Sequence, residues 1–422
     1  MSGGEALAGK NLTEPNFDMV FVTAAELPLI AGLQASQVFE PASMMVKRDH
    51  NVMWISAVPL LSYLKDVVLR TGKIKAVQNR CASEGIHFEY VVTPLTIGSP
   101  WAFMIRQPVL RWAAKKLLNH LQPLKGRKTI FHARSYFAAH LANEIKSQAK
   151  LAGVWRVSFD MRSVLPEEFP LTQGRLGKAC FGFAKQWEHE LVGKSDVSFL
   201  PLNYARDRMQ KESGHSVIFV PIQGFDREVG WSVDFEQRWS NRYIGYAGSI
   251  GAWHDPVLLL EILQSIPHAH PKLAMSPHPL LEGLDCKIYK HHEMAAYYDS
   301  LLALVIPGRK DFEKYFVSFK MRCNFFTTKA AEALSRGVPL IVSSELTELA
   351  DFVRVNECGA VYDPGKHRIV YPVGDWLEDK NEWYRLMENA KRTGALFTRS
   401  SVLQLYLAKW NALFEVHSGE IN

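Results

Sequence analysis

The chain of 422 residues is too long for one ordinary domain, and its length predicts two or three domains, of which we take two. Hydrophobic residues make up 47% and charged residues 22%, which is ordinary for a globular protein and excludes an intrinsically disordered chain. The net charge of +6 permits an anionic substrate or a membrane surface, but without an arginine-rich arm it does not indicate nucleic acid binding.

Cysteine spacing and terminal patterns exclude further classes. The five cysteines are scattered without any CxxC, so neither a zinc site nor a disulfide framework is predicted, and a reducing cytosol fits best. Residues 1–16 lack the basic and apolar segments of a signal peptide. No apolar run approaches the ~20 residues that a membrane-spanning helix needs. We therefore expect a cytoplasmic protein that is not integral to a membrane.

The first half of the sequence alternates strands and helices. Short apolar runs predict strands at 19–23, 52–58, 86–92, 129–132, 155–159 and 197–201. The helices expected between them carry Ser36, Gln37 and Phe39 or span 60–71, 135–149 and 175–193. This alternation predicts a doubly wound sheet, in which ligands bind just beyond the carboxyl ends of the strands.

Residues 106–128 are rich in lysine and arginine, contain no acidic residue and are interleaved with leucines and a tryptophan. This pattern predicts a basic amphipathic helix followed by a loop. Such a helix can lie on anionic lipid, or it can cover the sheet and present a solvated basic face. We keep both interpretations.

Polar side chains follow two of the predicted strands. His132 ends the strand at 129–132, and Asp160 and Arg162 follow the next strand. Because these strand ends are neighbours, the three side chains form a candidate ligand site. A buried structural histidine and a local salt bridge between Asp160 and Arg162 are the alternatives.

The irregular segment 224–241 separates this first half from a second half in which strands and helices also alternate. We place the domain boundary there, which gives domains at 1–225 and 226–422. Strands are expected at 243–247, 272–275, 287–289, 301–306, 340–342 and 360–362, and helices at 256–266, 294–300, 346–356, 381–392 and 400–416.

A glycine loop follows the first strand of this half. Gly245, Gly248 and Gly251 are spaced so that backbone amides, such as those of Gly248 and Ser249, can approach a phosphate at a helix amino end. The loop lacks both the GxGxxG spacing of a dinucleotide site and the lysine of a P-loop, which argues against a dehydrogenase and a P-loop ATPase. A plain tight turn is the alternative.

The sequence of residues 325–344 predicts a polar loop, a helix that ends at a glycine, and a buried strand. Thr327 or Thr328 can cap the helix, and Gly337 ends it. Lys329 and Glu332 lie on one face of its first turn, where Lys329 can meet a phosphate and Glu332 can accept hydrogen bonds from ribose hydroxyls. The alternative is a surface helix with an ion pair between these two residues.

Metal binding is not expected. His291, His292 and Glu293 are adjacent, so their side chains point in different directions, and no third ligand has a recognisable spacing. The sequence also contains no DxD pattern that would clamp a metal-bound diphosphate. We therefore predict no metal and no separate cofactor.

Together these segments resemble retaining, nucleotide-sugar-dependent glycosyltransferases of the GT-B fold, in particular the large family four of bacterial polysaccharide synthesis. The resemblance lies in the segments LQASQV (33–38), FDMRSVLPEE (159–168), YIGYAGSIGAWHD (243–255) and TTKAAEALSRGVPLIVSS (327–344), of which the last is the most specific. It implies an α/β fold of two Rossmann-like doubly wound domains facing a cleft. The first domain would bind the acceptor and the second the donor, with the helix at 400–416 packing back on the first.

The resemblance also implies residue roles. Glu332 would bind the donor's ribose, and the amides of Gly248 and Ser249 would meet the diphosphate. Lys329 and Arg322 would stabilise the departing diphosphate. In this sequence Asn324 stands where the family usually has the first acid of an E-x7-E pair.

His132, Asp160 and Arg162 would face the donor sugar or acceptor from the opposite wall as catalytic candidates. The implied reaction is metal-independent transfer of a hexosyl group, with retention, to a polysaccharide or lipid-linked glycan at the cytoplasmic face of the cell membrane. Residues 106–128 would contact that membrane. A non-catalytic GT-B-shaped protein that binds a glycan or a partner, and a sugar-nucleotide epimerase, are the alternatives.

Overall fold

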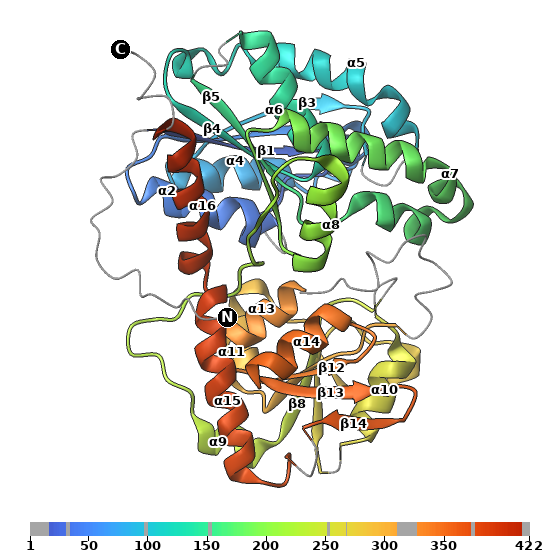
Figure 1. Cartoon of the computed structure of the whole chain (residues 1–422). Helices are drawn as coiled ribbons and strands as arrows, with labels where there is room; N and C mark the ends of the chain where they lie inside the picture. The colour runs from blue at the N-terminus through green and yellow to red at the C-terminus, as the bar shows by residue number, and fades with distance from the viewer. Residues whose placement is uncertain are drawn as a thin grey trace.

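The structure is a computed structural model, and it describes residues 17–30, 34–96, 100–150, 154–250, 254–266, 268–309, 327–372 and 376–415. Two seven-stranded sheets, each flanked by helices, form an upper and a lower domain (Figure 1). None of the helices in the described ranges combines the length and apolar content that crossing a bilayer requires.

The first sheet has the strand order β3-β2-β1-β4-β5-β6-β7, and all of its strand pairs are parallel. The strands are β1 (Asp18–Ala24), β2 (Val52–Pro59), β3 (His87–Thr93), β4 (Thr129–Arg134), β5 (Trp155–Asp160), β6 (Val197–Leu200) and β7 (Ile218–Phe219). Side chains alternate between two cores: Val20 and Val22 of β1 join one, and Met19 and Phe21 join the other.

Helices cover both faces of this sheet. They are α2 (Glu40–Val46), which follows the π-helical turn η1 (Ala35–Phe39), α3 (Leu60–Val68), α4 (Lys73–Ser83), α5 (Pro100–Leu117), α6 (Tyr136–Ala149), α7 (Leu165–Lys194) and α8 (Asn203–Ser213), with a 3-10 turn η2 at Gln122–Leu124. Residues of α5, α6 and α7 share one core, and residues of α2 and α4 share the other. The sheet is therefore doubly wound, with its strand-order reversal between β1 and β4.

The second sheet has the order β10-β9-β8-β11-β12-β13-β14, with only β14 antiparallel to its neighbour among the described strands. Its strands are β8 (Tyr243–Ala247), β9 (His270–Ala274), β10 (Asp285–Cys286), β11 (Ala303–Ile306), β12 (Leu340–Ser343), β13 (Gly359–Asp363) and β14 (Arg368–Tyr371). Its helices are α9 (Phe235–Asn241), α10 (Pro256–Gln264), α11 (Met294–Asp299), α13 (Thr328–Ser335), α14 (Thr347–Asn356) and α15 (Lys380–Gly394), with 3-10 turns η3 (Pro279–Leu281), η4 (His291–Glu293) and η6 (Ala395–Phe397).

The terminal helix α16 (Arg399–Glu415) continues from α15 and runs upward along the first domain (Figure 1). Its buried residues Val402, Leu403, Tyr406, Leu407 and Trp410 belong to the same core as β1 and α4. The indole Nε1 of Trp410 donates a hydrogen bond to Ser158 Oγ at 3.0 Å. The first described strand, β1, and the last described helix, α16, thus share one core of the first domain.

The predicted fold class, two doubly wound α/β domains, is confirmed. The elements that the pattern missed are short or polar, namely α4, α8, β7, α9 and β14, and the strand expected at 287–289 lies instead at Asp285–Cys286. The helix expected at 175–193 is the second of two segments of α7, which Gly174 separates with a non-helical φ of 55° and ψ of −128°. The first segment begins at Leu165, with Pro166 in its first turn, where proline is tolerated.

Candidate functional site

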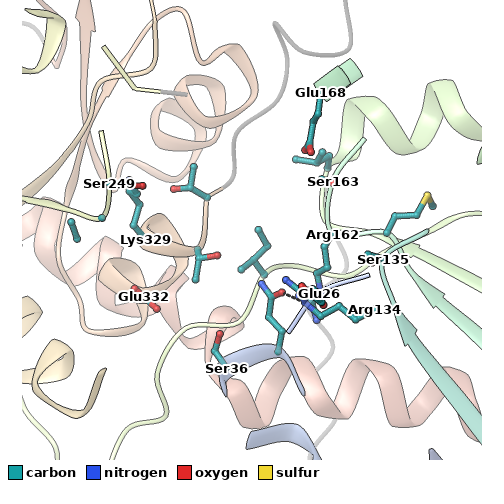
Figure 2. Close-up of a pocket in the computed structure, with 18 of the residues that line it drawn as sticks. Glu26, Ser36, Arg134, Ser135, Arg162, Ser163, Glu168, Ser249, Lys329 and Glu332 are labelled. Carbon is teal, nitrogen blue, oxygen red and sulfur yellow. Dashed lines mark hydrogen bonds and ion pairs between the residues drawn. The ribbon is translucent and has the colours of Figure 1, made fainter. Parts of the chain in front are cut away.

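A cavity of about 710 Å³ lies between the two domains and is lined by residues of both. The first domain contributes residues at or just beyond the carboxyl ends of β1, β4 and β5, among them Glu26, Arg134 and Arg162. The second contributes the loop after β8 and the first turns of α13. In Figure 2, Ser249, Lys329 and Glu332 lie on one side and the arginines on the other. The cavity is therefore at the position where α/β sheets of this kind bind ligands.

The start of α13 is fixed by its sequence. Thr327 is the N-cap residue, and its hydroxyl accepts a hydrogen bond from the Ala330 amide at 3.3 Å. Beyond the last turn, Gly337 adopts φ +64° and ends the helix, as predicted. Alanines bury the inner face of the helix, so its rotation is set by packing and presents Lys329 and Glu332 to the cavity.

The Lys329 ammonium lies against aromatic and neutral groups. Its Nζ is 3.3 Å from Tyr246 Oη, 3.2 Å from His254 Nε2 and 4.5 Å from the centroid of the Tyr246 ring. Among the described residues, it forms no salt bridge. Burial lowers the pKa of Lys329 to about 7, although Glu332 opposes the shift. Burial, and then the charge of Lys329, lowers the pKa of His254 well below its usual range.

The glycine loop lies directly beside this ammonium. Gly248 has φ +100°, and a Cβ added there would be 3.2 Å from Lys329 Nζ. Tyr246, near the end of β8, donates its hydroxyl hydrogen to the Ser249 carbonyl at 2.9 Å and so shapes the loop. A cation and a glycine loop without side chains form a place where an anionic group can approach the backbone.

Glu332 occupies the floor of the cavity and does not pair with Lys329, so the ion pair that the sequence left open is absent between these two described residues. Its Oε2 accepts a hydrogen bond from the Tyr298 hydroxyl at 2.8 Å. Burial raises the pKa of Glu332 against the opposing effects of Tyr298 and nearby cations. A buried carboxylate with one occupied oxygen can accept further hydrogen bonds from a ligand.

Arg162 forms the opposite wall. Its backbone has φ +51°, its Nε lies 2.5 Å from Asp160 Oδ2, and its side chain is only 8% exposed. Among the residues that the structure describes, the buried Nη1 atom has no hydrogen-bond partner. An unsatisfied guanidinium donor beside a cavity is available to a polar ligand.

His132 and Asp160 lie behind Arg162, where their side chains are 3% and 1% exposed, and neither lines the cavity. His132 Nε2 is 3.5 Å from Asp160 Oδ2, its Nδ1 is 3.1 Å from Ser158 Oγ, and its ring packs against Trp410 of α16. Burial alone would raise the pKa of Asp160, but Arg162 and His132 outweigh it and lower that pKa. This geometry suits the positioning of Arg162.

The cavity thus brings together five of the predicted site residues, namely Arg162, Gly248, Ser249, Lys329 and Glu332. Two further predicted residues, Arg322 and Asn324, lie outside the described residues.

The sequence did not point to Tyr246, His254 or Tyr298 as site residues, and Glu168, the last residue of the segment 159–168, was given no role. Tyr246 and His254 flank the glycine loop within the segment 243–255, so their nearness to the loop was visible in the sequence. Burial raises the pKa of Glu168, on the first-domain wall, to about 7.

Comparisons with known proteins support the architecture. Neither a protein-family model nor a curated protein sequence matches the chain significantly. Solved structures do match over nearly the whole length. Sucrose-phosphate synthase from Thermosynechococcus elongatus is similar with a TM-score of 0.64 at 13% identity, covering 94% of this chain and 100% of that one.

Two structures with bound ligands are also similar. The Anabaena protein HepE in complex with UDP-glucose has a TM-score of 0.56 at 11% identity, with 93% of this chain and 98% of that one covered. The catalytic domain of starch synthase IV from Arabidopsis thaliana, bound to ADP and acarbose, has a TM-score of 0.59 at 11% identity, with 94% and 99% covered. With its two doubly wound sheets facing a cavity, the chain therefore has the GT-B fold of glycosyltransferases.

Proposed function

We propose that the chain is a retaining glycosyltransferase that moves a hexosyl group from a nucleotide-diphosphate sugar to a polysaccharide or lipid-linked glycan. The observation that carries the proposal is the arrangement of Lys329 and Glu332 on one helix face, opposite the Gly248–Ser249 loop and inside the interdomain cavity. In similar folds, HepE binds UDP-glucose, which is a nucleotide-diphosphate sugar, and starch synthase IV binds ADP, which is a nucleoside diphosphate.

Each part of the donor has a matching group. The diphosphate approaches the backbone amides of the glycine loop and the Lys329 ammonium, which gains the anionic partner that it lacks among the described residues. Glu332 accepts hydrogen bonds from the ribose hydroxyls while Tyr298 holds its other side. Arg162 directs its Nη1 hydrogens, which have no partner among the described residues, toward the transferred sugar or the glycan that accepts it.

In the reaction, the bond between the anomeric carbon and the diphosphate oxygen breaks, the acceptor oxygen forms a bond to the same face of that carbon, and the proton of the acceptor hydroxyl passes to the departing diphosphate. Negative charge grows on the departing diphosphate, and Lys329 stabilises it, together with Arg322 by family resemblance. This cation pair is the reason to propose transfer without a metal. His132 and Asp160 act by holding Arg162.

The purified protein should be incubated with a panel of UDP-, GDP- and ADP-sugars. We expect slow release of the nucleoside diphosphate from one donor, unaffected by EDTA and lost in Glu332→Ala, and an anomeric proton of unchanged configuration in the product by NMR. An isomerised donor would indicate an epimerase. Absence of nucleotide binding across the panel would leave the non-catalytic binding protein.

The proposal includes a cytoplasmic location and a membrane-associated acceptor, with residues 106–128 near the lipid. In α5 the residues Leu110, Ala113, Ala114 and Leu117 are buried, so this segment offers the membrane its exposed cations and the single exposed aromatic Trp112. Sedimentation with anionic vesicles that falls with added salt supports this contact, and equal sedimentation with neutral vesicles contradicts it.

A further inference from the structure

Helix α3 (Leu60–Val68) carries its apolar side chains outward. Large aliphatic residues of this helix and of the residue after it are exposed, namely Leu60 (42%), Leu61 (67%), Leu64 (44%), Val67 (54%), Val68 (72%) and Leu69 (68%). Leu60, Leu64 and Val67 follow the helical spacing of one face, with Leu61 and Val68 alongside. Such a contiguous apolar stripe on a surface marks an interaction site.

The helix is held in this orientation by its polar face. Asp66 is the only buried residue of α3. Its carboxylate accepts hydrogen bonds from the amides of Lys73 at 2.8 Å and Ile74 at 3.2 Å, at the amino end of α4, and from the Thr71 hydroxyl. Turning the aliphatic stripe inward would break these bonds, so the outward stripe is built into the fold.

Exposed cations surround the stripe. Lys65, Arg70, Lys73 and Lys75 are all exposed, and between residues 60 and 83 the only acidic residue is the buried Asp66. An apolar stripe edged by lysine and arginine is complementary to a bilayer surface with anionic headgroups. A second copy of the chain is a poor occupant, because it would bring two like-charged rims together.

We propose that α3 is the membrane-docking element of the protein, with its leucines and valines inserted at the headgroup boundary of an anionic bilayer and its cations on the headgroups. The occupant is lipid, and the contact needs no nucleotide. Helix α5 differs, because its leucines and alanines face the core and only its cationic residues and a few single apolar side chains reach the surface. The proposal therefore assigns the anchor to α3.

The test is sedimentation of the full chain with phosphatidylcholine vesicles, with and without phosphatidylglycerol. We expect binding that increases with phosphatidylglycerol and falls by at least about tenfold in L61Q/V68Q. The variant K65Q/R70Q should lose most of the dependence on salt. Both pairs are exposed, so unchanged thermal unfolding should show that the fold is intact.

Two controls separate α3 from other surfaces. Val355→Gln makes the same chemical change on α14, where the side chain is 81% exposed, and should leave vesicle binding unchanged. K115Q/K116Q on α5 should weaken binding less than L61Q/V68Q does. Nucleotide binding should persist in L61Q/V68Q. A result that contradicts the docking proposal therefore does not contradict the proposed use of a nucleotide sugar, and the reverse also holds.

Three results would overturn the proposal. They are absence of sedimentation with any vesicle, equal sedimentation of L61Q/V68Q and the unchanged protein, and a concentration-dependent dimer that L61Q/V68Q dissociates. The last of these would assign the stripe to a second copy.

Discussion

Glu40 Oε1, on α2 of the first domain, lies 3.2 Å from Nε2 of His291 in the second domain. The other carboxylate oxygen of Glu40 lies 3.0 Å from Nη2 of Arg399 at the start of α16. His291 also lines the interdomain cavity. One carboxylate therefore joins the two domains and the terminal helix beside the candidate site.

This contact predicts a pH-dependent stability. The hydrogen bond that His291 donates to the Glu40 carboxylate raises the pKa of His291, while burial opposes the shift. A raised histidine pKa gives stability that is fully present below about pH 6.5 and is lost as the pH rises through the folded-state pKa. The difference in unfolding free energy between the unchanged protein and His291→Gln should be about 1 kcal/mol in acid and vanish in alkali. Thermal unfolding across pH measures it.

A suitable control is His87→Gln, because His87 pairs with Glu89 within one domain and is 59% exposed. If the difference in unfolding free energy between the unchanged protein and His291→Gln were the same at every pH, the prediction would be contradicted. The contribution of the pair would then not depend on the protonation of His291.

Nucleotide binding should take up a proton at Lys329. The pKa of this lysine is about 7 because of burial, so much of it is neutral above that pH, and a bound diphosphate would raise the pKa. Calorimetry in buffers of different ionisation enthalpy should find uptake of up to about one proton near pH 8 and almost none near pH 6. Affinity should fall as the pH rises above about 7.

The variants of this site identify the group that is protonated. Lys329→Arg keeps the charge at all pH values and should abolish the uptake, as should Lys329→Met. His254→Gln removes the neighbouring imidazole ring and should leave the proton uptake unchanged. Loss of uptake only in His254→Gln would assign the proton to the histidine instead.

Glu332 should discriminate ribose hydroxyls. Hydrogen bonds to a charged group contribute about 1.5–3 kcal/mol, so removing both ribose hydroxyls from the best-binding nucleotide should weaken its binding by about 10- to 100-fold. In Glu332→Ala the two nucleotides should bind equally. Equilibrium dialysis measures the binding of both nucleotides, with and without ribose hydroxyls, to the unchanged protein and to Glu332→Ala. The control variant Glu168→Gln, on the opposite wall, should still bind the two nucleotides with different affinities. Discrimination that survives Glu332→Ala would place the ribose elsewhere.

The start and end of α13 were predictable because their causes are local. A threonine cap, a glycine with positive φ and a following apolar strand all act within a few residues. The same holds for the alternation that indicated two doubly wound sheets. Short strands such as β7 and β14 lack enough residues to show a period, and they form because a neighbouring strand supplies their hydrogen bonds.

The surroundings of His132 and α3 depend on distant contacts. Along β4, Ile130 and His132 point to one face of the sheet. The resemblance implied that the helix at 400–416 packs on the first domain, but the sequence does not reveal that it covers this face with Tyr406 and Trp410. In α3 the aliphatic spacing alone favours an inward stripe, and Asp66 reverses it through bonds to the next helix. Side-chain direction therefore required the tertiary structure in both cases.

Gly248→Ala should weaken nucleotide binding because the added methyl group would contact the Lys329 ammonium. Gly283→Ala provides a matched control. Both glycines have positive φ, +100° and +86°, so an alanine at either position strains the backbone by about 1–2 kcal/mol. A Cβ at Gly248 would lie 3.2 Å from Lys329 Nζ, whereas nothing lies within 4 Å of a Cβ at Gly283. Both variants should unfold at a lower temperature, and only Gly248→Ala should lose affinity in titration calorimetry. Equal losses of affinity would indicate that backbone strain, and not displacement of Lys329, governs the site.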